Sequence, residues 1–131
     1  MKQMLGTTLA LTLVSAIGMA GTASAQTVKG TAAIGITQPA TKVVGKEVVT
    51  TMKIKNMSKG PIAGLKVEEY WYDKGGDPSP GGSQLLKEPL AAGAVVSVEL
   101  RTPRTDKMDR NTYQFSHANG QVTVKVFAKL Q

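Results

Sequence analysis

Cysteine is absent from the 131 residues of the chain, and histidine occurs only once, as His117. Without cysteine there is no disulfide bond, no thiolate nucleophile or zinc ligand, and no lipid-modified N-terminal cysteine. A single histidine argues against multi-histidine metal sites and histidine relays. The composition therefore predicts a protein that holds no metal ion and no cofactor.

Long apolar runs are also missing. The most apolar stretch, residues 5–20, would span about 24 Å as a helix, less than the roughly 30 Å hydrocarbon core of a bilayer. It follows Lys2 and precedes the small residues Ala23-Ser24-Ala25, which is typical of a secretory signal peptide rather than of a membrane anchor. We expect residues 1–25 to be cleaved off after Ala25. The mature protein would then have no transmembrane segment and would be periplasmic or extracellular.

The mature part, residues 26–131, has room for one domain with one core. Sustained helical periodicity is absent from it, and short stretches of alternating apolar and polar residues predict strands instead. These stretches are Val28–Thr37, Val48–Lys55, Leu65–Asp73, Ser83–Lys87, Ala94–Arg101, Thr112–His117 and Gln121–Lys129. A long glycine- and proline-rich loop at Gly75–Gly82 and a tight hairpin signal at Asn119-Gly120 separate some of them.

About seven strands, each burying one face, predict an all-β fold: an Ig-like sandwich of two antiparallel sheets. A small open barrel is the alternative. The inward positions define the predicted core, which is Ile34, Ile36, Val48, Met52, Ile54, Leu65, Val67, Trp71, Val96, Val98, Leu100, Tyr113, Phe115, Val122, Val124 and Val126.

Glu69 breaks this pattern, because the alternation that turns its apolar neighbours inward also turns Glu69 inward. Burying an unpaired carboxylate is costly. We expect Glu69 to lie near the end of the sheet, where it reaches water. The alternatives are an ion pair with Lys53 or Lys125, or a bulge after Glu68 that reverses the phase of the strand.

Four short segments of the mature chain resemble a known protein family. Residues 55–59 (KNMSK), 62–67 (IAGLKV) and 71–76 (WYDKGG), with Leu90–Val98 (LAAGAVVSV), resemble bacterial FxLYD-type domains. The similarity extends over roughly Val48 to Leu130. It departs from the family pattern at Glu69, Trp71 and Ala92, where phenylalanine, leucine and proline are usual. The resemblance implies an Ig-like or fibronectin-like sandwich of an exported protein, and it brings no catalytic residue with it.

Tyr70 and Tyr72 are the first candidate ligand-binding residues. If Trp71 faces inward, both tyrosines lie on the outer face of one strand, about 7 Å apart. Two aromatic rings on such a face can stack on a sugar ring or give a protein partner a rigid contact area. The alternative is that the tyrosines cover a sheet edge or lie under the proline-rich loop.

The second candidate is a basic patch made of Arg101, Arg104, Lys107 and Arg110. Arginine suits phosphate and carboxylate groups, so this patch would bind an anionic envelope polymer or an acidic partner. Asp106 and Asp109 lie within the same stretch, and their negative charges reduce its positive electrostatic potential. Together with export, this reduction argues against nucleic acid. A solvated loop with internal ion pairs is the alternative.

The sequence gives no pattern that predicts catalysis. His117 ends a predicted strand beside a hairpin signal, and no G-x-S-x-G motif accompanies it. Glu68 and Glu69 are adjacent, so a strand points them to opposite faces. Asp73 and Asp77 are more typical of a turn than of a calcium loop.

The sequence therefore predicts a non-enzymatic exported domain that acts as a binding or scaffolding module. Its partner would be an envelope protein or a glycan. The alternative function is that of a small carbohydrate-binding module that stacks sugars on the tyrosine pair.

The signal peptide gives a direct prediction: the exported protein should begin at Gln26, because the small residues that a signal peptidase requires end at Ala25. Intact-mass spectrometry of the exported product checks this. An exported product that still carries Met1 would contradict it.

Overall fold

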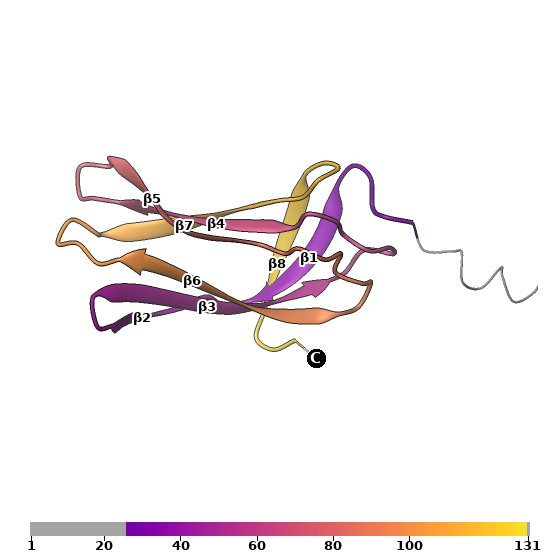
Figure 1. The fold of residues 1–131 in the computed structure, drawn as a ribbon, viewed down its shortest axis with the longest axis horizontal. Helices are drawn as coiled ribbons and strands as arrows, with labels where there is room; N and C mark the ends of the chain where they lie inside the picture. Colours follow the sequence, from indigo (N-terminus) through magenta and orange to yellow (C-terminus); the bar gives the residue numbers. More distant parts are fainter. Residues whose placement is uncertain (1–25, 131) are drawn as a thin grey trace, which may run out of the picture.

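The computed structural model describes residues 26–130, which form two β-sheets packed face to face (Figure 1). The strands are β1 (Ala32–Thr37), β2 (Ala40–Val44), β3 (Glu47–Asn56), β4 (Lys66–Tyr72), β5 (Pro78–Leu85), β6 (Val95–Pro103), β7 (Arg110–Ser116) and β8 (Val122–Phe127). No helix occurs in this part of the chain. The all-β sandwich predicted from the sequence is confirmed, with eight strands where about seven were expected. The predicted signal peptide lies outside the described residues.

The larger sheet is built around β3. Strand β6 pairs antiparallel with nearly the whole of β3, so β2 and β1 must share its other edge. Strand β2 pairs with the first half of β3 and β1 with the end of it. Strand β8 then pairs with β1 in parallel. The prediction of purely antiparallel sheets is therefore wrong at this one pair, which joins the first and last strands of the domain.

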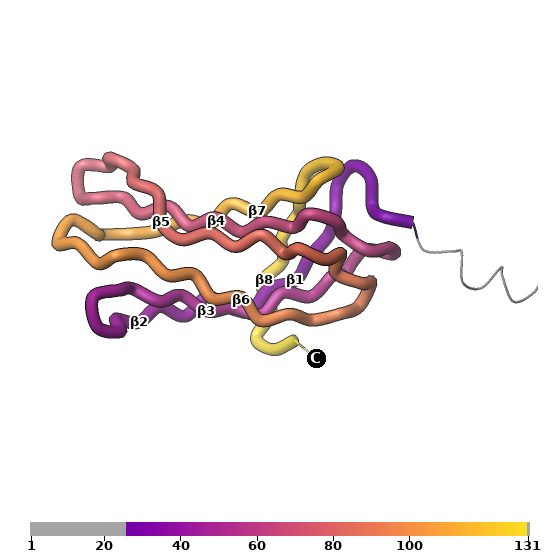
Figure 2. Tube along the Cα trace, in the orientation of Figure 1, coloured from indigo at the N-terminus to yellow at the C-terminus, as the bar shows by residue number. Residues whose placement is uncertain are grey.

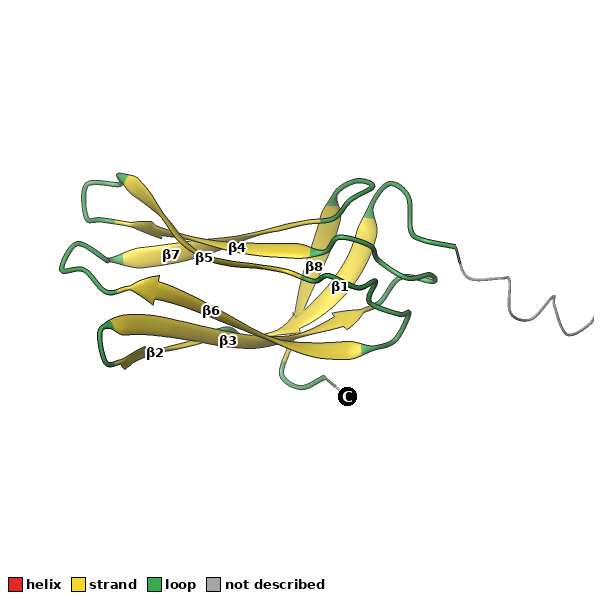
Figure 3. Ribbon diagram, in the orientation of Figure 1, coloured by secondary structure: helices red, strands yellow, loops and turns green. Residues whose placement is uncertain are grey.

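The smaller sheet has the antiparallel order β5–β4–β7. It lies over β3 and β6, whereas β1 and β8 run steeply across one end of the sandwich (Figure 3). The turns β2–β3, β4–β5 and β6–β7 gather at the opposite end (Figure 2). Because β7 and β8 enter different sheets, the Asn119-Gly120 turn connects two strands that share only the bridge between His117 and Gly120.

Strand β5 replaces most of the loop that the sequence predicted at Gly75–Gly82. Its prolines are tolerated because β5 is an edge strand that pairs only with β4 among the described residues, so no strand on its other side requires the missing N–H of Pro78 or Pro80. The register changes opposite Glu69, where Gly81 and Gly82 together face one residue of β4. This β-bulge lies in β5 and not in β4.

The predicted core is largely confirmed. Ten of its members are buried: Ile34, Ile36, Val48, Met52, Ile54, Leu65, Val67, Trp71, Val98 and Leu100. Four more pack against this core while partly exposed: Val96, Tyr113, Phe115 and Val122. The prediction is wrong for Val124 and Val126, which are exposed. Ile62 and Leu90 join the core from outside the main strands, because each donates its N–H to the carbonyl of the other.

A buried asparagine closes the turn after β3. The side chain of Asn56 is fully buried, and its Nδ2 donates to the carbonyl oxygens of Gly60 and Leu90, both at 2.8 Å. Its Oδ1 accepts the N–H of Ser58 at 2.8 Å. One side chain thus satisfies two carbonyls and one amide, and fixes the turn against the Leu90 segment.

The bulge in β5 makes Gly82 sensitive to substitution. A Cβ on Gly82 would lie 2.6 Å from the carbonyl oxygen and 2.7 Å from the nitrogen of Arg101, both backbone atoms of β6. We expect Gly82→Ala to lower the free energy of unfolding by about 1–3 kcal/mol, because β5 must move away from β6. Urea denaturation measures it.

Gly75→Ala is the matched control. A Cβ there would meet only the Asp73 side chain, at an ordinary 3.4 Å, and Gly75 does not have a positive φ. Equal stability of the two variants would show that the close approach of β5 to β6 is not required.

Candidate functional site

Strand β4 presents its two faces to different environments. Val67, Glu69 and Trp71 are buried between the sheets, and the residues between them point outward. Tyr70 and Tyr72 are therefore on the outer face of the smaller sheet, each half-buried. The inward and outward facing of the β4 side chains is therefore the one predicted from the alternation of its sequence.

Glu69 is not at the rim of the core, contrary to the sequence prediction: only 1% of it is exposed. Its Oε2 accepts hydrogen bonds from Thr50 Oγ1 and Asn111 Nδ2, both at 2.8 Å, and its Oε1 accepts one from Thr102 Oγ1 at 3.3 Å. No ion pair with Lys53 or Lys125 forms. Neutral donors from both sheets replace the expected contact with water, and so satisfy the carboxylate where it is buried.

Tyr113 lies beside this cluster. Asn111 Nδ2 donates to its hydroxyl oxygen at 3.0 Å. Burial raises the pKa of Tyr113, with a smaller contribution from the charge of Glu69.

The outer face of the smaller sheet is defined by strand register. Tyr70 lies between Pro80 of β5 and Thr112 of β7, and Tyr72 lies between Pro78 and Arg110. Residues directly opposite each other on neighbouring strands share a face. The two tyrosines and the two prolines therefore make one continuous surface, which we call the tyrosine face. Pro78, Pro80, Thr112 and Arg110 are exposed.

Charged groups surround the tyrosine face. The Tyr70 hydroxyl donates to Glu68 Oε2 at 3.3 Å, and Lys66 Nζ lies 3.6 Å from the same oxygen. The negative charge of Glu68 raises the pKa of Tyr70. At the other end, the Arg110 guanidinium lies 5.4 Å from the centre of the Tyr72 ring, which is a cation–π contact. The surface thus combines apolar rings with a donor and an acceptor group.

The four predicted basic residues do not form one surface. Arg101 is on the outer face of the larger sheet, where it pairs with Glu47 at 2.9 Å and Glu99 at 3.2 Å. These two carboxylates raise the pKa of Arg101. Arg110 is on the smaller sheet, and Arg104 and Lys107 lie in the connection between β6 and β7. The sequence interval is short, but its residues end on different faces because β6 and β7 belong to different sheets.

His117 is a structural residue of the turn between β7 and β8. It is buried rather than at the surface as predicted, with Nε2 2.7 Å from the carbonyl oxygen of Gly30. Its Nδ1 accepts the N–H of Asn119 at 3.3 Å. Both ring nitrogens are thus engaged by the backbone.

The carboxylates give no metal centre within residues 26–130, where no three or more His, Asp or Glu side chains are grouped to hold a metal ion. Asp73 Oδ1 accepts the N–H of Asp77 at 2.9 Å, which is a turn interaction. The same residues include no helix of the length and apolarity needed to cross a membrane.

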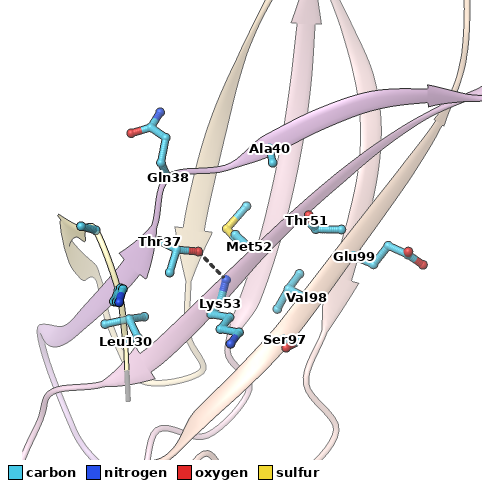
Figure 4. Close-up of a pocket in the computed structure, with 12 residues that line it drawn as sticks. Thr37, Gln38, Ala40, Thr51, Met52, Lys53, Ser97, Val98, Glu99 and Leu130 are labelled. Carbon is cyan, nitrogen blue, oxygen red and sulfur yellow. Dashed lines mark hydrogen bonds between the residues drawn. The ribbon is translucent and has the colours of Figure 1, made fainter.

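A cleft of about 610 Å³ on the larger sheet was not foreseen from the sequence (Figure 4). It forms where the chain passes from β1 to β2 and where the segment after β8 returns. The N–H of Lys53 donates to Thr37 Oγ1 at 2.9 Å beside it. Its lining residues are Thr37, Gln38, Ala40, Thr51, Met52, Lys53, Ser97, Val98, Glu99, Ala128, Lys129 and Leu130. They come from four separate parts of the sequence, so no local motif marks them.

No protein-family model matches the sequence, and no curated protein shows significant similarity to it. The resemblance to FxLYD-type domains therefore stays a prediction.

The hydrogen bonds of Glu69 lead to a prediction about stability. Glu69→Val should lower the free energy of unfolding by at least about 2 kcal/mol, because it removes the acceptor of the buried hydroxyls of Thr50 and Thr102 and of the partly buried amide of Asn111. Glu68→Val, on the outer face of the same strand, should change it by less than about 0.5 kcal/mol. Thermal and urea denaturation of both variants and of the wild type measure these differences in the free energy of unfolding. A Glu69→Val protein as stable as the wild type would show that these hydrogen bonds contribute nothing net.

Proposed function

We propose that the protein is an exported, non-enzymatic binding module whose ligand surface is the tyrosine face. The observation that carries the proposal is the cross-strand register that sets Tyr70 beside Pro80 and Tyr72 beside Pro78 on the outer face of the smaller sheet. This gives an apolar surface on two paired strands, and a partner can bury it without ordering a loop.

Export is supported by the sequence of residues 1–25, which has the short apolar run and small-residue end of a signal peptide. The non-enzymatic part of the proposal is supported by His117, the one imidazole of the chain, whose two nitrogens are engaged by backbone groups. A partner in the cell envelope or outside the cell fits both observations.

A glycan is the second candidate ligand, and a specific feature favours it. The tyrosine rings are flanked by Glu68 at one end and by Arg110 at the other. Sugar rings offer an apolar face for stacking and hydroxyl groups at their edges, so they match apolar rings with a carboxylate and a guanidinium nearby. A protein partner would use the same rings as contact area and the same charges as its rim.

A double variant tests the ligand surface. Tyr70→Ala with Tyr72→Ala should abolish or weaken about tenfold any binding of the wild type to an array of envelope glycans, since the loss of two stacking rings removes at least about 1.4 kcal/mol. The same variant should lose the envelope proteins that immobilised wild-type protein retains, if the partner is a protein.

Leu85→Ala is the control. Leu85 is an exposed apolar residue on the same outer face, next to Lys66 and away from the tyrosines. Undiminished binding by the folded double tyrosine variant would refute the assignment of the tyrosine face.

A further inference from the structure

Two side chains of β8 lie on the core face of their sheet and yet are exposed. By register, Val124 is opposite Ile34 and Val126 is opposite Ile36. The two isoleucines are 2% and 4% exposed, whereas Val124 is 39% and Val126 is 54% exposed. Opposite residues of neighbouring strands share a face. The core is therefore left open along β8.

The backbone of β8 is also open on one side. Among residues 26–130, β8 pairs with β1 alone. The turn that joins β7 to β8 contains the bridge between His117 and Gly120, but the two strands themselves do not pair. The carbonyl of Gln121 points at β1, where it accepts the N–H of Ala32 at 2.8 Å. Because backbone groups of successive strand residues point to opposite sides, the N–H and C=O groups of Val122, Val124 and Val126 point away from β1. One edge of β8 thus combines free ladder groups with exposed valines.

The charge of β8 and of its one paired strand has one sign. Strands β1 and β8 lie within residues 26–39 and 118–131, which hold three basic residues (Lys29, Lys125 and Lys129) and no acidic one. All nine acidic residues lie between Glu47 and Asp109. On β8 itself, Lys125 is exposed in the centre of the strand, on the face opposite to the two valines.

We propose that the free edge of β8 binds an extended, acidic segment of a partner protein as an added β-strand. Its residues opposite Val124 and Val126 would be apolar and would cover the open part of the core. Its residues opposite Lys125 would be acidic, since opposite charges stabilise a cross-strand pair. A second copy of this chain is the weaker occupant, because antiparallel pairing of two β8 strands brings like charges together, and each copy is strongly basic.

Two capped, dye-labelled peptides serve as probes. One alternates glutamate with valine, and the other alternates lysine with valine. In fluorescence anisotropy at low ionic strength, the purified protein should bind the glutamate peptide and not the lysine peptide. Amide shifts in NMR spectra of the complex should centre on residues 122–127. Equal binding of both peptides, no binding of the glutamate peptide, or a concentration-dependent dimer that excludes it would overturn the proposal.

Two charge reversals separate a specific contact from general attraction. Lys125→Glu should weaken binding of the glutamate peptide about fivefold, because it makes an attractive cross-strand pair repulsive. Lys87→Glu changes the net charge equally at an exposed site in the β5–β6 connection, and should have little effect. An equal loss in both variants would reduce the interaction to net charge and would refute the added strand.

Val124→Pro tests the backbone edge, because it removes an N–H that faces away from β1. If this variant folds, it should lose the peptide. If it does not fold, the pair of charge reversals still decides. The variant with both tyrosines replaced by alanine should bind the peptide normally, since the tyrosine face is on the other sheet. Failure of the added strand and failure of the proposed function are therefore distinguishable.

Discussion

The carboxylate of Glu69 is hydrogen-bonded to both sheets, and the facing of β4 depends on it. Its donors are Thr50 and Thr102 on the larger sheet and Asn111 on the smaller one. If this carboxylate left the interior, its three donors would lose their hydrogen-bond acceptor. Because side chains alternate along a strand, holding Glu69 inside holds Tyr70 and Tyr72 outside. The candidate ligand surface is thus a consequence of a polar residue in the core.

The same contact explains why glycine occurs opposite Glu69. Gly82 donates its N–H to Thr102 Oγ1 at 2.8 Å, and a Cβ on Gly81 would lie 2.8 Å from the carbonyl oxygen of Glu69. A side chain at Gly82 would separate β5 from β6, and one at Gly81 would separate it from β4. Two glycines in a bulge let the edge of the smaller sheet reach the larger one, and they leave Pro78 and Pro80 in line with the tyrosines. The composition that suggests a loop serves here as an edge strand.

The strands with strict alternation could be predicted from the sequence, because one buried face imposes a period of two. This holds for β3, β4 and β6, and for most of the core they supply. Strand β2 could not be recognised, since all five of its residues are exposed and no burial pattern marks it. The exposure of Val124 and Val126 is also invisible in the sequence. It depends on the place of β8 at the edge of the larger sheet beside β1, which is a contact between the first and last strands of the domain.

The hydrogen-bond partners of Glu69 could not be predicted from the sequence either, because they are uncharged and distant along the chain. The sequence predicts water or a cation as the partner of Glu69, because an isolated buried carboxylate requires one of them. Threonine and asparagine carry no charge that would single them out, and they come from strands 19, 33 and 42 residues away. Conversely, the basic residues between Arg101 and Arg110 are close in sequence but are divided between two sheets. Proximity along the chain says little about a shared surface when consecutive strands change sheets.

The distribution of charge makes the two surfaces of this molecule chemically different. Around the tyrosine face, Glu68 and Arg110 place both signs beside apolar rings, so a ligand with neutral polar groups can satisfy each of them. Along β8, Lys125 has no acidic residue beside it in β8 or in β1, the strand with which β8 pairs. Lysine on an open edge opposes pairing between identical basic chains and permits pairing with an acidic one. The two proposed surfaces lie on different sheets and require different chemistry, so a partner at the tyrosine face would leave the edge of β8 open to a second one.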